Sequence, residues 1–447
     1  MRGFVAMGLA EKQSWTILCL ARGDSQNARI LGRGTMQADV VKIIRARDAK
    51  LDPERLALKY AAMRKNPFAF FRATCALFHL ALPKLGRLMQ APPAWCCGDL
   101  HLENFGTFRA ANKLVYFDLN DFDEALLAPC SFDVLRATAS IAVARKSLGL
   151  SRTRETALMQ LYVSSYAATL RAGRIGWIER DSATGPIGEL MAQLKGMSRK
   201  DLLDRRTIVS GRSRRILIDG SHALAAPASE KIRVARLVDQ YGRKHADAMG
   251  LPADYYEVVD IALRISGLGS LGVERYVVLV KGKGGADEMR LLDLKRSRPS
   301  ASVGASPCKQ PHWHSEAERV FAIQQRMQAR SPAHLGFIVD RNRSYILREL
   351  QPREDRLDLS QVSSQPDGLE TAIKSFGELT GFAQLRASGR QGAANADALI
   401  DYGHKDKWQM RLLGLAAQCA TRAEEDWEIY TKAYDKGLFI RGSSSAA

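Results

Sequence analysis

Several features of common protein classes are missing from this chain of 447 residues. It contains no apolar run of about 18 residues, so we expect no membrane-spanning helix. The apolar stretch near its N-terminus is too short for a secretory signal. Its seven cysteines lack C-x-x-C spacing, which argues against zinc and against a disulfide framework. These absences predict a cytoplasmic protein with reduced thiols.

Signals for metal-binding histidines and for nucleic-acid binding are also weak. The eight histidines show no metal-ligand spacing, and no helix-turn-helix or zinc-finger pattern occurs. The densest basic stretch, residues 199–215, lacks the interleaved aromatic residues of a single-strand binder. We expect this stretch to be a mobile, solvated loop, with substrate capture as the second interpretation. Nucleic acid is therefore a disfavoured partner, although the net charge of +18 favours anionic partners in general.

Acidic and amide side chains crowd into one short region, the most informative part of the chain. Asp99 and Asn104 follow one apolar run, and a second apolar run delivers Asp118, with Asp121 and Asp123 close behind. In kinase-like phosphotransferases such a loop supplies an Asp that accepts the substrate proton and an Asn that holds Mg²⁺. We therefore predict that Asp99 is the base or the substrate-orienting group. Asn104 and Asp118 would hold the metal, with Asp121 as a competing or additional ligand.

A simpler interpretation of this region is a polar turn between two buried strands, because turn geometry favours Asp and Asn. A turn does not need so many acidic groups, however. Carboxylates crowded at the ends of two strands would repel one another without a cation. The pattern therefore favours a metal site over a plain turn.

A glycine-rich segment follows much later in the chain. Gly267, Gly269 and Gly272 fit G-x-G-x-x-G, which occurs in dinucleotide-binding folds and in kinases. The run 276–280 that follows is aromatic and β-branched, which indicates a strand and favours the kinase arrangement, in which backbone amides cover the ATP phosphates. A hairpin turn and another strand then present Lys295, where a phosphate-pairing lysine would lie. The alternative for this motif alone is a surface hairpin with a basic tip.

The expected nucleotide-binding lobe continues beyond Lys295. Residues 315–329 form an amphipathic pattern that predicts a helix, and its Glu316 or Glu318 could pair with Lys295. In an ordinary kinase the glycine-rich loop precedes the catalytic loop, whereas here it follows. The simplest account is a circular permutation of the kinase fold.

The sequence therefore predicts an α+β, two-lobed, protein-kinase-like fold that is circularly permuted. The lobes differ in composition, with helices dominating the large lobe and an antiparallel sheet the small one. The expected divisions are a leader (1–38), a large-lobe part with the catalytic loop (39–250), a small nucleotide-binding lobe (251–352) and large-lobe C-terminal helices (353–447).

The acidic region is similar to that of a bacterial family catalogued as domain of unknown function 2252. Members of this family carry GDxHxxNFG and FDxNDFDE, here residues 98–106 and 117–124, followed by a helix with an Asp, here Asp133. The similarity covers most of the chain, residues 50–435. Because the family has no defined function, the resemblance implies a fold more than a reaction.

A more distant resemblance connects Gly98–Asn104 with the loop of aminoglycoside phosphotransferases. These enzymes usually have His before the Gly, where this chain has Cys97. The resemblance implies that Asp133 anchors the catalytic loop from the following helix. An acid favoured by the dipole at a helix N-terminus is a compatible explanation of the same residue.

The combined prediction is an ATP- and Mg²⁺-dependent phosphotransferase that acts on an unknown acceptor, which the basic charge suggests is anionic. Lys295 would pair with the phosphates, and Glu318 would position Lys295. The three glycines would let the backbone close over the nucleotide. Two alternatives share these motifs: nucleotidyl transfer by the same fold, and a nucleotide-binding pseudokinase that acts as a scaffold. The oligomeric state has no signal in the sequence.

Overall fold

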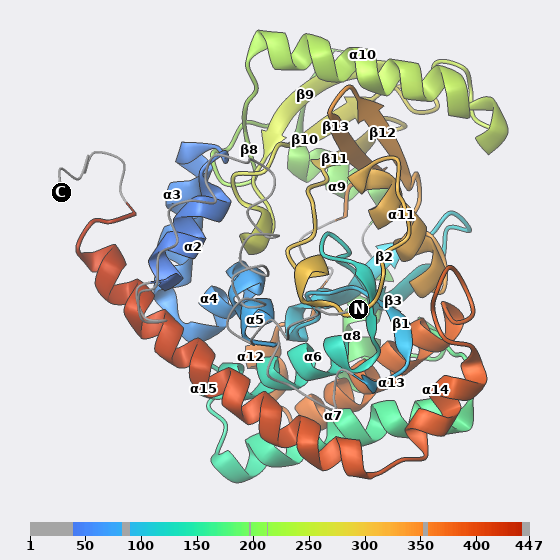
Figure 1. The fold of residues 1–447 in the computed structure, drawn as a ribbon. Coiled ribbons are helices and arrows are strands. Elements are labelled where there is room, and N and C mark those ends of the chain that lie inside the picture. The colour runs from blue at the N-terminus through green and yellow to red at the C-terminus, as the bar shows by residue number, and fades with distance from the viewer. Residues whose placement is uncertain (1–38, 83–89, 196–197, 212, 352–355, 440–447) are drawn as a thin grey trace, which may run out of the picture.

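The computed structural model describes residues 39–82, 90–195, 198–211, 213–351 and 356–439. The expected leader, residues 1–38, lies outside this range. Helices gather at one end of the molecule and a sheet covered by a long helix forms the other end, with short strands between them (Figure 1). The α+β prediction is confirmed, and the sheets are antiparallel. No helix in the described residues is both long enough and apolar enough to cross a membrane.

Four helices open the described chain, and local sequence explains where two of them begin. Asp52 accepts a hydrogen bond from the Arg55 N–H and precedes a proline, and Asn66 does the same for the Ala69 N–H before the next proline. Such caps satisfy N–H groups that a helix start leaves without partners, and proline is tolerated at the first position. The four helices are α2 (Asp39–Asp48), α3 (Pro53–Lys65), α4 (Pro67–Ala73) and α5 (Cys75–Ala81).

Four short strands carry the acidic region predicted to be catalytic, and a fifth, β5, pairs with β3. β1 pairs with β4, and β2 pairs with β3 so that Gly106 lies opposite Asp118. The loop between β1 and β2 contains Asp99, and the loop between β3 and β4 contains Asp121. These strands are β1 (Pro93–Cys96), β2 (Phe105–Arg109), β3 (Val115–Leu119), β4 (Leu126–Pro129) and β5 (Ile178–Glu179).

A six-stranded antiparallel sheet makes up the other end of the molecule, in the order β12-β13-β11-β10-β9-β8. Alternate residues of its central strand face opposite sides, because side chains alternate along a strand. Tyr276 and Val278 pack with Val234 of helix α10, whereas Val277 and Leu279 pack on the other face. The elements are α10 (Ala228–His245), β8 (Ala223–Ala225), β9 (Val258–Arg264), β10 (Arg275–Val280), β11 (Arg290–Arg296), β12 (Gly336–Asp340) and β13 (Arg343–Glu349).

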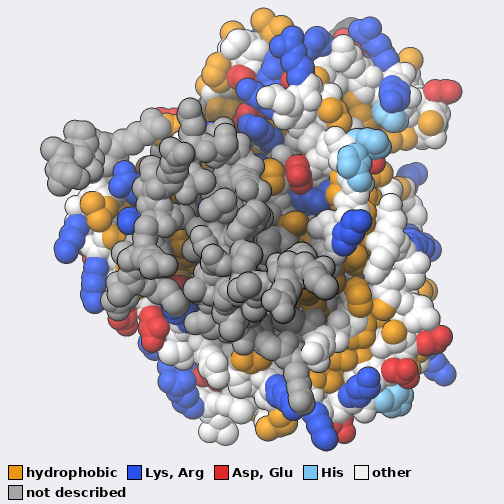
Figure 2. Space-filling model, in the orientation of Figure 1, with side chains coloured by type: hydrophobic (Ala, Val, Ile, Leu, Met, Phe, Trp, Pro, Cys, Tyr) orange, Lys and Arg blue, Asp and Glu red, His pale blue; other side chains and the backbone are white. Residues whose placement is uncertain are grey.

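The described part of the basic stretch 199–215 is folded, so the prediction of a mobile loop is wrong. It forms α9 (Arg199–Arg206), β6 (Thr207–Ser210) and β7 (Ser213–Ile216). Leu203 and Ile216 pack against the six-stranded sheet, and the buried Arg214 pairs with Asp204 at 2.6 Å and Asp287 at 2.7 Å. Apolar anchors and acidic partners therefore hold a segment that its charge alone marked as solvated. Figure 2 shows Lys and Arg side chains spread over both ends of the visible face.

The remaining helices enclose the main core beneath the short strands. α13 packs along α7, and α15 packs along α6 (Figure 1). Val40 and Ile44 of α2 share an apolar cluster with Tyr430 and Phe439, so the first and last described segments meet. These helices are α6 (Ser131–Ala144), α7 (Arg152–Ala172), α8 (Gly185–Lys195), α11 (Glu316–Met327), α12 (Leu359–Ser364), α13 (Gly368–Arg386), α14 (Ala396–Gly403) and α15 (Lys407–Asp435).

Candidate functional site

A charged, open cavity lies where the acidic region meets the glycine-rich turn. Asp99, Asp121 and Asp123 line it together with Gly269 and Ser270 of the glycine-rich turn. Segments far apart in the sequence, which the sequence analysis assigned to one site, therefore share one cavity. Five basic side chains line it as well: Arg47, Lys59, Arg72, Arg296 and Arg298.

The loop before Asp99 is held by a buried acid from α6. The N–H groups of Cys97 and Gly98 donate to Asp133 Oδ2 and Oδ1 at 2.8 and 2.9 Å. Gly98 has a φ of +80°, and a Cβ there would lie 2.1 Å from the Glu124 carbonyl oxygen, so only glycine fits. Burial raises the pKa of Asp133 to about 6, although the two N–H donors oppose this shift. The resemblance implied that Asp133 anchors the loop, and these contacts confirm it.

A second brace of this loop comes from α5. His79 Nε2 lies 2.8 Å from the Gly98 carbonyl oxygen and therefore donates to it. Burial lowers the pKa of His79 to about 3, which keeps the ring neutral. Sequence reasoning missed this residue, because nothing distinguishes a buried histidine on an apolar helix from other core residues.

Asp99 itself pairs with a buried arginine. Arg136 Nε and Nη2 lie 2.7 and 2.6 Å from Asp99 Oδ1, and the guanidinium stacks 3.7 Å from the Phe71 ring centre. Burial raises the pKa of Asp99 to about 6, while Arg136 opposes the rise. Arg136 was not predicted, but it lies three residues after Asp133 on α6 and so shares its helical face.

Asn104 is buried, and its hydrogen bonds hold the Asp99 loop in place. Its Nδ2 donates to the Asp99 backbone carbonyl oxygen at 2.6 Å. The backbone carbonyl oxygen of Asn104 accepts from the Asn120 N–H at 2.8 Å. It thus connects the Asp99 loop with the segment that leads to Asp121. His101 Nδ1 accepts from the Glu103 N–H at 3.2 Å, which is a structural contact within the same loop.

The two candidate metal-binding aspartates point to different places. Asp118 is buried and lies away from the cavity, where its Oδ1 accepts from the Leu119 N–H and its Oδ2 from the Ala329 N–H, both at 2.9 Å. Arg386 lies 3.8 Å from the same carboxylate. Asp121 lines the cavity instead. The structure therefore brings Asp121, and not Asp118, to Asp99.

Lys295 of β11 faces the acids that follow β3. Its Nζ contacts Asp123 Oδ2 and lies 3.8 Å from Asp121 Oδ1. Although burial alone would raise it, Lys295 and Arg348 hold the pKa of Asp121 below its ordinary value. The suggested pairing of Lys295 with Glu318 is absent from the described structure. Glu318 instead accepts from the His314 N–H at 2.6 Å, because it closes the N-terminus of α11.

The glycine-rich turn joins β9 to β10 and lies over α3 and α4. Gly267 and Gly272 have φ values of +76° and +90°. A Cβ on Gly272 would meet Leu51 Cβ at 2.9 Å, and the Gly272 carbonyl oxygen accepts from the Asp52 N–H at 3.0 Å. The positive φ values and the close approach explain the glycines in this turn. Gly269 is the predicted glycine that reaches the cavity wall.

A buried arginine on α11 connects the acidic loop to the strand that carries Lys295. The Nη2 of Arg319 donates to the carbonyl oxygens of Asp123 at 2.9 Å and Arg298 at 3.1 Å, and its Nη1 donates to that of Ala125. Arg319 thereby fixes the backbone at Asp123 and at Arg298. Arg319 was not among the predicted site residues, although it lies next to Glu318 on α11.

The chemistry of this arrangement fits a divalent cation and phosphates. Asp121 and Asp123 supply hard oxygen ligands of the kind Mg²⁺ prefers, and Lys295 supplies a cation at the same point. No group of three or more His, Cys, Asp or Glu poised to hold a metal occurs among the described residues. Mg²⁺ would therefore need phosphate oxygens and water to complete its coordination, as is usual for this ion.

Comparison with known proteins identifies the chain at the level of a family. Residues 50–433 match the model of a family described as "Uncharacterized protein conserved in bacteria (DUF2252)". No curated protein and no solved structure matches the chain.

Proposed function

We propose that this chain, which belongs to the DUF2252 family, is an ATP- and Mg²⁺-dependent phosphotransferase with a circularly permuted kinase-like fold. One observation carries the proposal: Asp99, Asp121 and the glycine-rich turn line the same cavity, with Lys295 paired to the acids at its edge. Kinase-like enzymes need a proton acceptor, metal-binding carboxylates, a phosphate-pairing lysine and a loop that covers the phosphates.

The arrangement of the chain supports the permuted kinase-like fold. The six-stranded sheet carries the glycine-rich turn between β9 and β10 and presents Lys295 on the next strand, β11. The Asp99 loop lies earlier in the chain, opposite this sheet. The contact between α2 and α15 brings the described chain ends together at the helical end, as a permutation within the larger lobe requires.

In the proposed reaction a hydroxyl oxygen of the acceptor forms a bond to the γ-phosphorus of ATP. The bond between that phosphorus and the β–γ bridging oxygen breaks, and ADP leaves with the electron pair. Asp99 takes the hydroxyl proton and later releases it to solvent. Arg136 would hold the Asp99 carboxylate in one orientation, and Asp133 would hold the backbone of the two residues before Asp99.

Asp121 and Asp123 are the residues that would hold Mg²⁺, because Asp118 is turned away from the cavity. Bound Mg²⁺ would neutralise phosphate charge, which is what this ion supplies in phosphoryl transfer. The Asp121 and Asp123 side chains are 41% and 37% exposed, so a ligand can reach them. Lys295 would exchange its carboxylate partners for phosphate oxygens when a nucleotide binds.

A pseudokinase scaffold is the second candidate, and one observation favours it. Asp99 is ion-paired with Arg136, and Lys295 is ion-paired with the acids, so both key side chains already have partners. A scaffold of this kind would bind nucleotide without turning it over. Nucleotidyl transfer is the further alternative, because it uses the same groups on a different phosphate.

ATP labelled at the γ- or the α-phosphate separates these possibilities. In the absence of a known acceptor, slow hydrolysis and autophosphorylation are the measurable reactions. We expect release or transfer of the γ-label, and a rate that falls about 10²–10⁴-fold in Asp99→Asn, the usual contribution of a positioned general base. Transfer of the α-label would indicate nucleotidyl transfer. Equal rates for wild type and Asp99→Asn would contradict the proposed phosphotransferase.

A further inference from the structure

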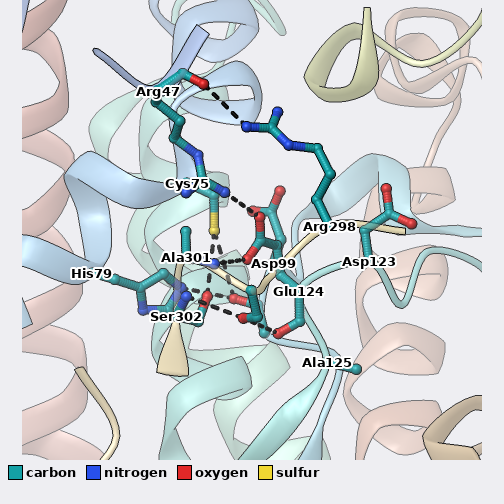
Figure 3. Close-up of polar contacts among 12 residues, drawn as sticks. Arg47, Cys75, His79, Asp99, Asp123, Glu124, Ala125, Arg298, Ala301 and Ser302 are labelled. Carbon is teal, nitrogen blue, oxygen red and sulfur yellow. Dashed lines mark hydrogen bonds and ion pairs between the residues drawn. The ribbon is translucent and has the colours of Figure 1, made fainter. Parts of the chain in front are cut away.

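Adjacent acids in the loop after β3 point to two different groups of basic side chains. Asp123 contacts Lys295, whereas Glu124 Oε1 lies 2.9 Å from Arg47 Nη2. Figure 3 shows the two carboxylates turned apart, with Glu124 directed at Arg47 and Asp123 standing to one side. The cavity therefore has a second basic end, separate from Lys295. We call it the Arg298 group, and it consists of Arg47 (α2), Lys59 (α3) and Arg298 (after β11).

Two acids lie beside the Arg298 group, and both are bound by Lys59, by Arg47 or by the backbone. Lys59 Nζ lies 2.8 and 2.9 Å from the two oxygens of Asp48. Glu124 gives one oxygen to Arg47 and the other to the Ala301 N–H, at 2.5 Å. These contacts leave neither carboxylate directed at Arg298.

Arg298 has no acidic partner among the residues that the structure describes. Its Nη2 donates to the Arg47 carbonyl oxygen at 3.1 Å, the contact visible at the top of Figure 3. Burial and the neighbouring Arg47 lower the pKa of Arg298, and burial together with Arg47 and Arg298 lowers that of Lys59 despite its pairing with Asp48. The three positive charges of the Arg298 group therefore face only the two negative charges of Asp48 and Glu124, which pair with it. Such an excess in a partly buried place favours the binding of an anion.

We propose that the Arg298 group binds an oxyanion, a phosphate or a carboxylate, carried by the acceptor. The group lines the same cavity as Asp99, so an acceptor held there by its oxyanion could place a hydroxyl near the proposed base. Arginine suits this task, because its planar guanidinium presents paired N–H donors to phosphate and carboxylate oxygens. The assignment to the acceptor rests on the proposed phosphotransferase function, whereas the oxyanion site itself does not.

Titration calorimetry with inorganic phosphate tests the site on the full chain, without nucleotide or Mg²⁺ and at constant ionic strength. We expect one phosphate per chain, bound about 10-fold to 100-fold more weakly by Arg298→Gln, the scale of a charge-assisted contact. Arg298→Lys keeps the charge and should bind better than Arg298→Gln. Arg243→Gln, on the exposed face of α10, removes the same charge far from the cavity and should bind as wild type does. Acetate in place of phosphate shows whether a carboxylate also binds.

Lys295→Gln distinguishes this site from the nucleotide site. Phosphate binding should survive in Lys295→Gln and fail in Arg298→Gln. The reverse result would place the anion at the nucleotide site and overturn the inference, while leaving the proposed function intact. Absence of phosphate binding to wild type would also overturn it. Circular dichroism checks folding, and Arg47→Gln replaces Arg298→Gln if the latter does not fold, with the same weakening expected.

Discussion

The two sides of the cavity are held in place by different kinds of interaction. On the Asp99 side, N–H groups of Cys97 and Gly98 donate to the buried Asp133, and His79 donates to the Gly98 carbonyl oxygen. On the Lys295 side, a lysine pairs with two acids that are 41% and 37% exposed. Buried hydrogen bonds of the first kind are costly to break. In the pairs of the second kind Lys295 is buried but both acids are partly exposed, so a ligand from solvent can reach the acids and replace their partner.

This difference indicates which side a ligand would change. The Asp99 loop would keep its shape with or without nucleotide, because its anchors lie in the core. Lys295 and Asp121 would rearrange, because Mg²⁺ and phosphate offer each of them a stronger partner than the other provides.

The largest effect on stability should come from the anchor of the Asp99 loop. Asp133→Ala leaves two buried N–H groups without acceptors, so we expect the free energy of unfolding to fall by about 2–6 kcal/mol, at about 1–3 kcal/mol for each group. Urea denaturation measures it. Asp133→Asn keeps the size and one acceptor and should lose less. A loss below about 1 kcal/mol in Asp133→Ala would show that the loop does not depend on this anchor.

A smaller effect, on binding rather than on stability, is expected at Lys295. Lys295→Ala should weaken nucleotide binding by about 1.5–3 kcal/mol, the range of hydrogen bonds to charged groups. Mg²⁺ alone should bind this variant more tightly than wild type, because the lysine no longer neutralises Asp121 and Asp123. Lys281→Ala, on the neighbouring hairpin and paired with Asp254, is the matched control and should change neither quantity. Unchanged nucleotide affinity in Lys295→Ala would remove its assigned role.

The smallest effect concerns the pH dependence of turnover. Asp99 has a pKa of about 6 and must be deprotonated to accept a proton, so activity should rise with pH through about 6 and then level off. Arg136 lowers the pKa of Asp99, so Arg136→Gln should move this rise to higher pH. Arg136→Lys keeps the charge and should move it less. A profile that stays in place in Arg136→Gln would contradict the assignment of Asp99 as the base.

Much of the framework was predictable from the sequence, because local patterns determine it. The run 276–280 forms β10, the glycine-rich turn precedes it, and Lys295 follows on the next strand, as its spacing indicated. Helix α11 also lies within the predicted stretch 315–329. The kinase-like interpretation of these elements stays a proposal.

The choice between Asp118 and Asp121 could not be made from the sequence. Asp118 lies on β3 between Phe117 and Leu119, and its orientation depends on where the strand ends and on what covers it. In the structure α13 and the end of α11 supply Arg386 and the Ala329 region as its neighbours. Those contacts connect residues more than 200 positions apart, and no local pattern encodes them.

The partners in the ion pairs could not be predicted from the sequence either. Glu318 had suitable spacing to serve as the partner of Lys295, but the helix start uses it locally. Among the described residues Arg298 has no ion-pair partner, and this follows from how three separate segments meet. Charge composition alone also misjudged 199–215, where burial of Arg214 depends on acids from two different elements.

In the proposed site Asp121, rather than Asp118, brings Mg²⁺ and ATP into the cavity of Asp99. Titration calorimetry of ATP, with and without Mg²⁺, tests it most directly on wild type, Asp121→Asn and Asp118→Asn. We predict that wild type binds ATP tightly only with Mg²⁺, that Asp121→Asn loses this dependence, and that folded Asp118→Asn keeps it. Equal binding with and without Mg²⁺ in wild type, or loss of the dependence in Asp118→Asn alone, would contradict the claim.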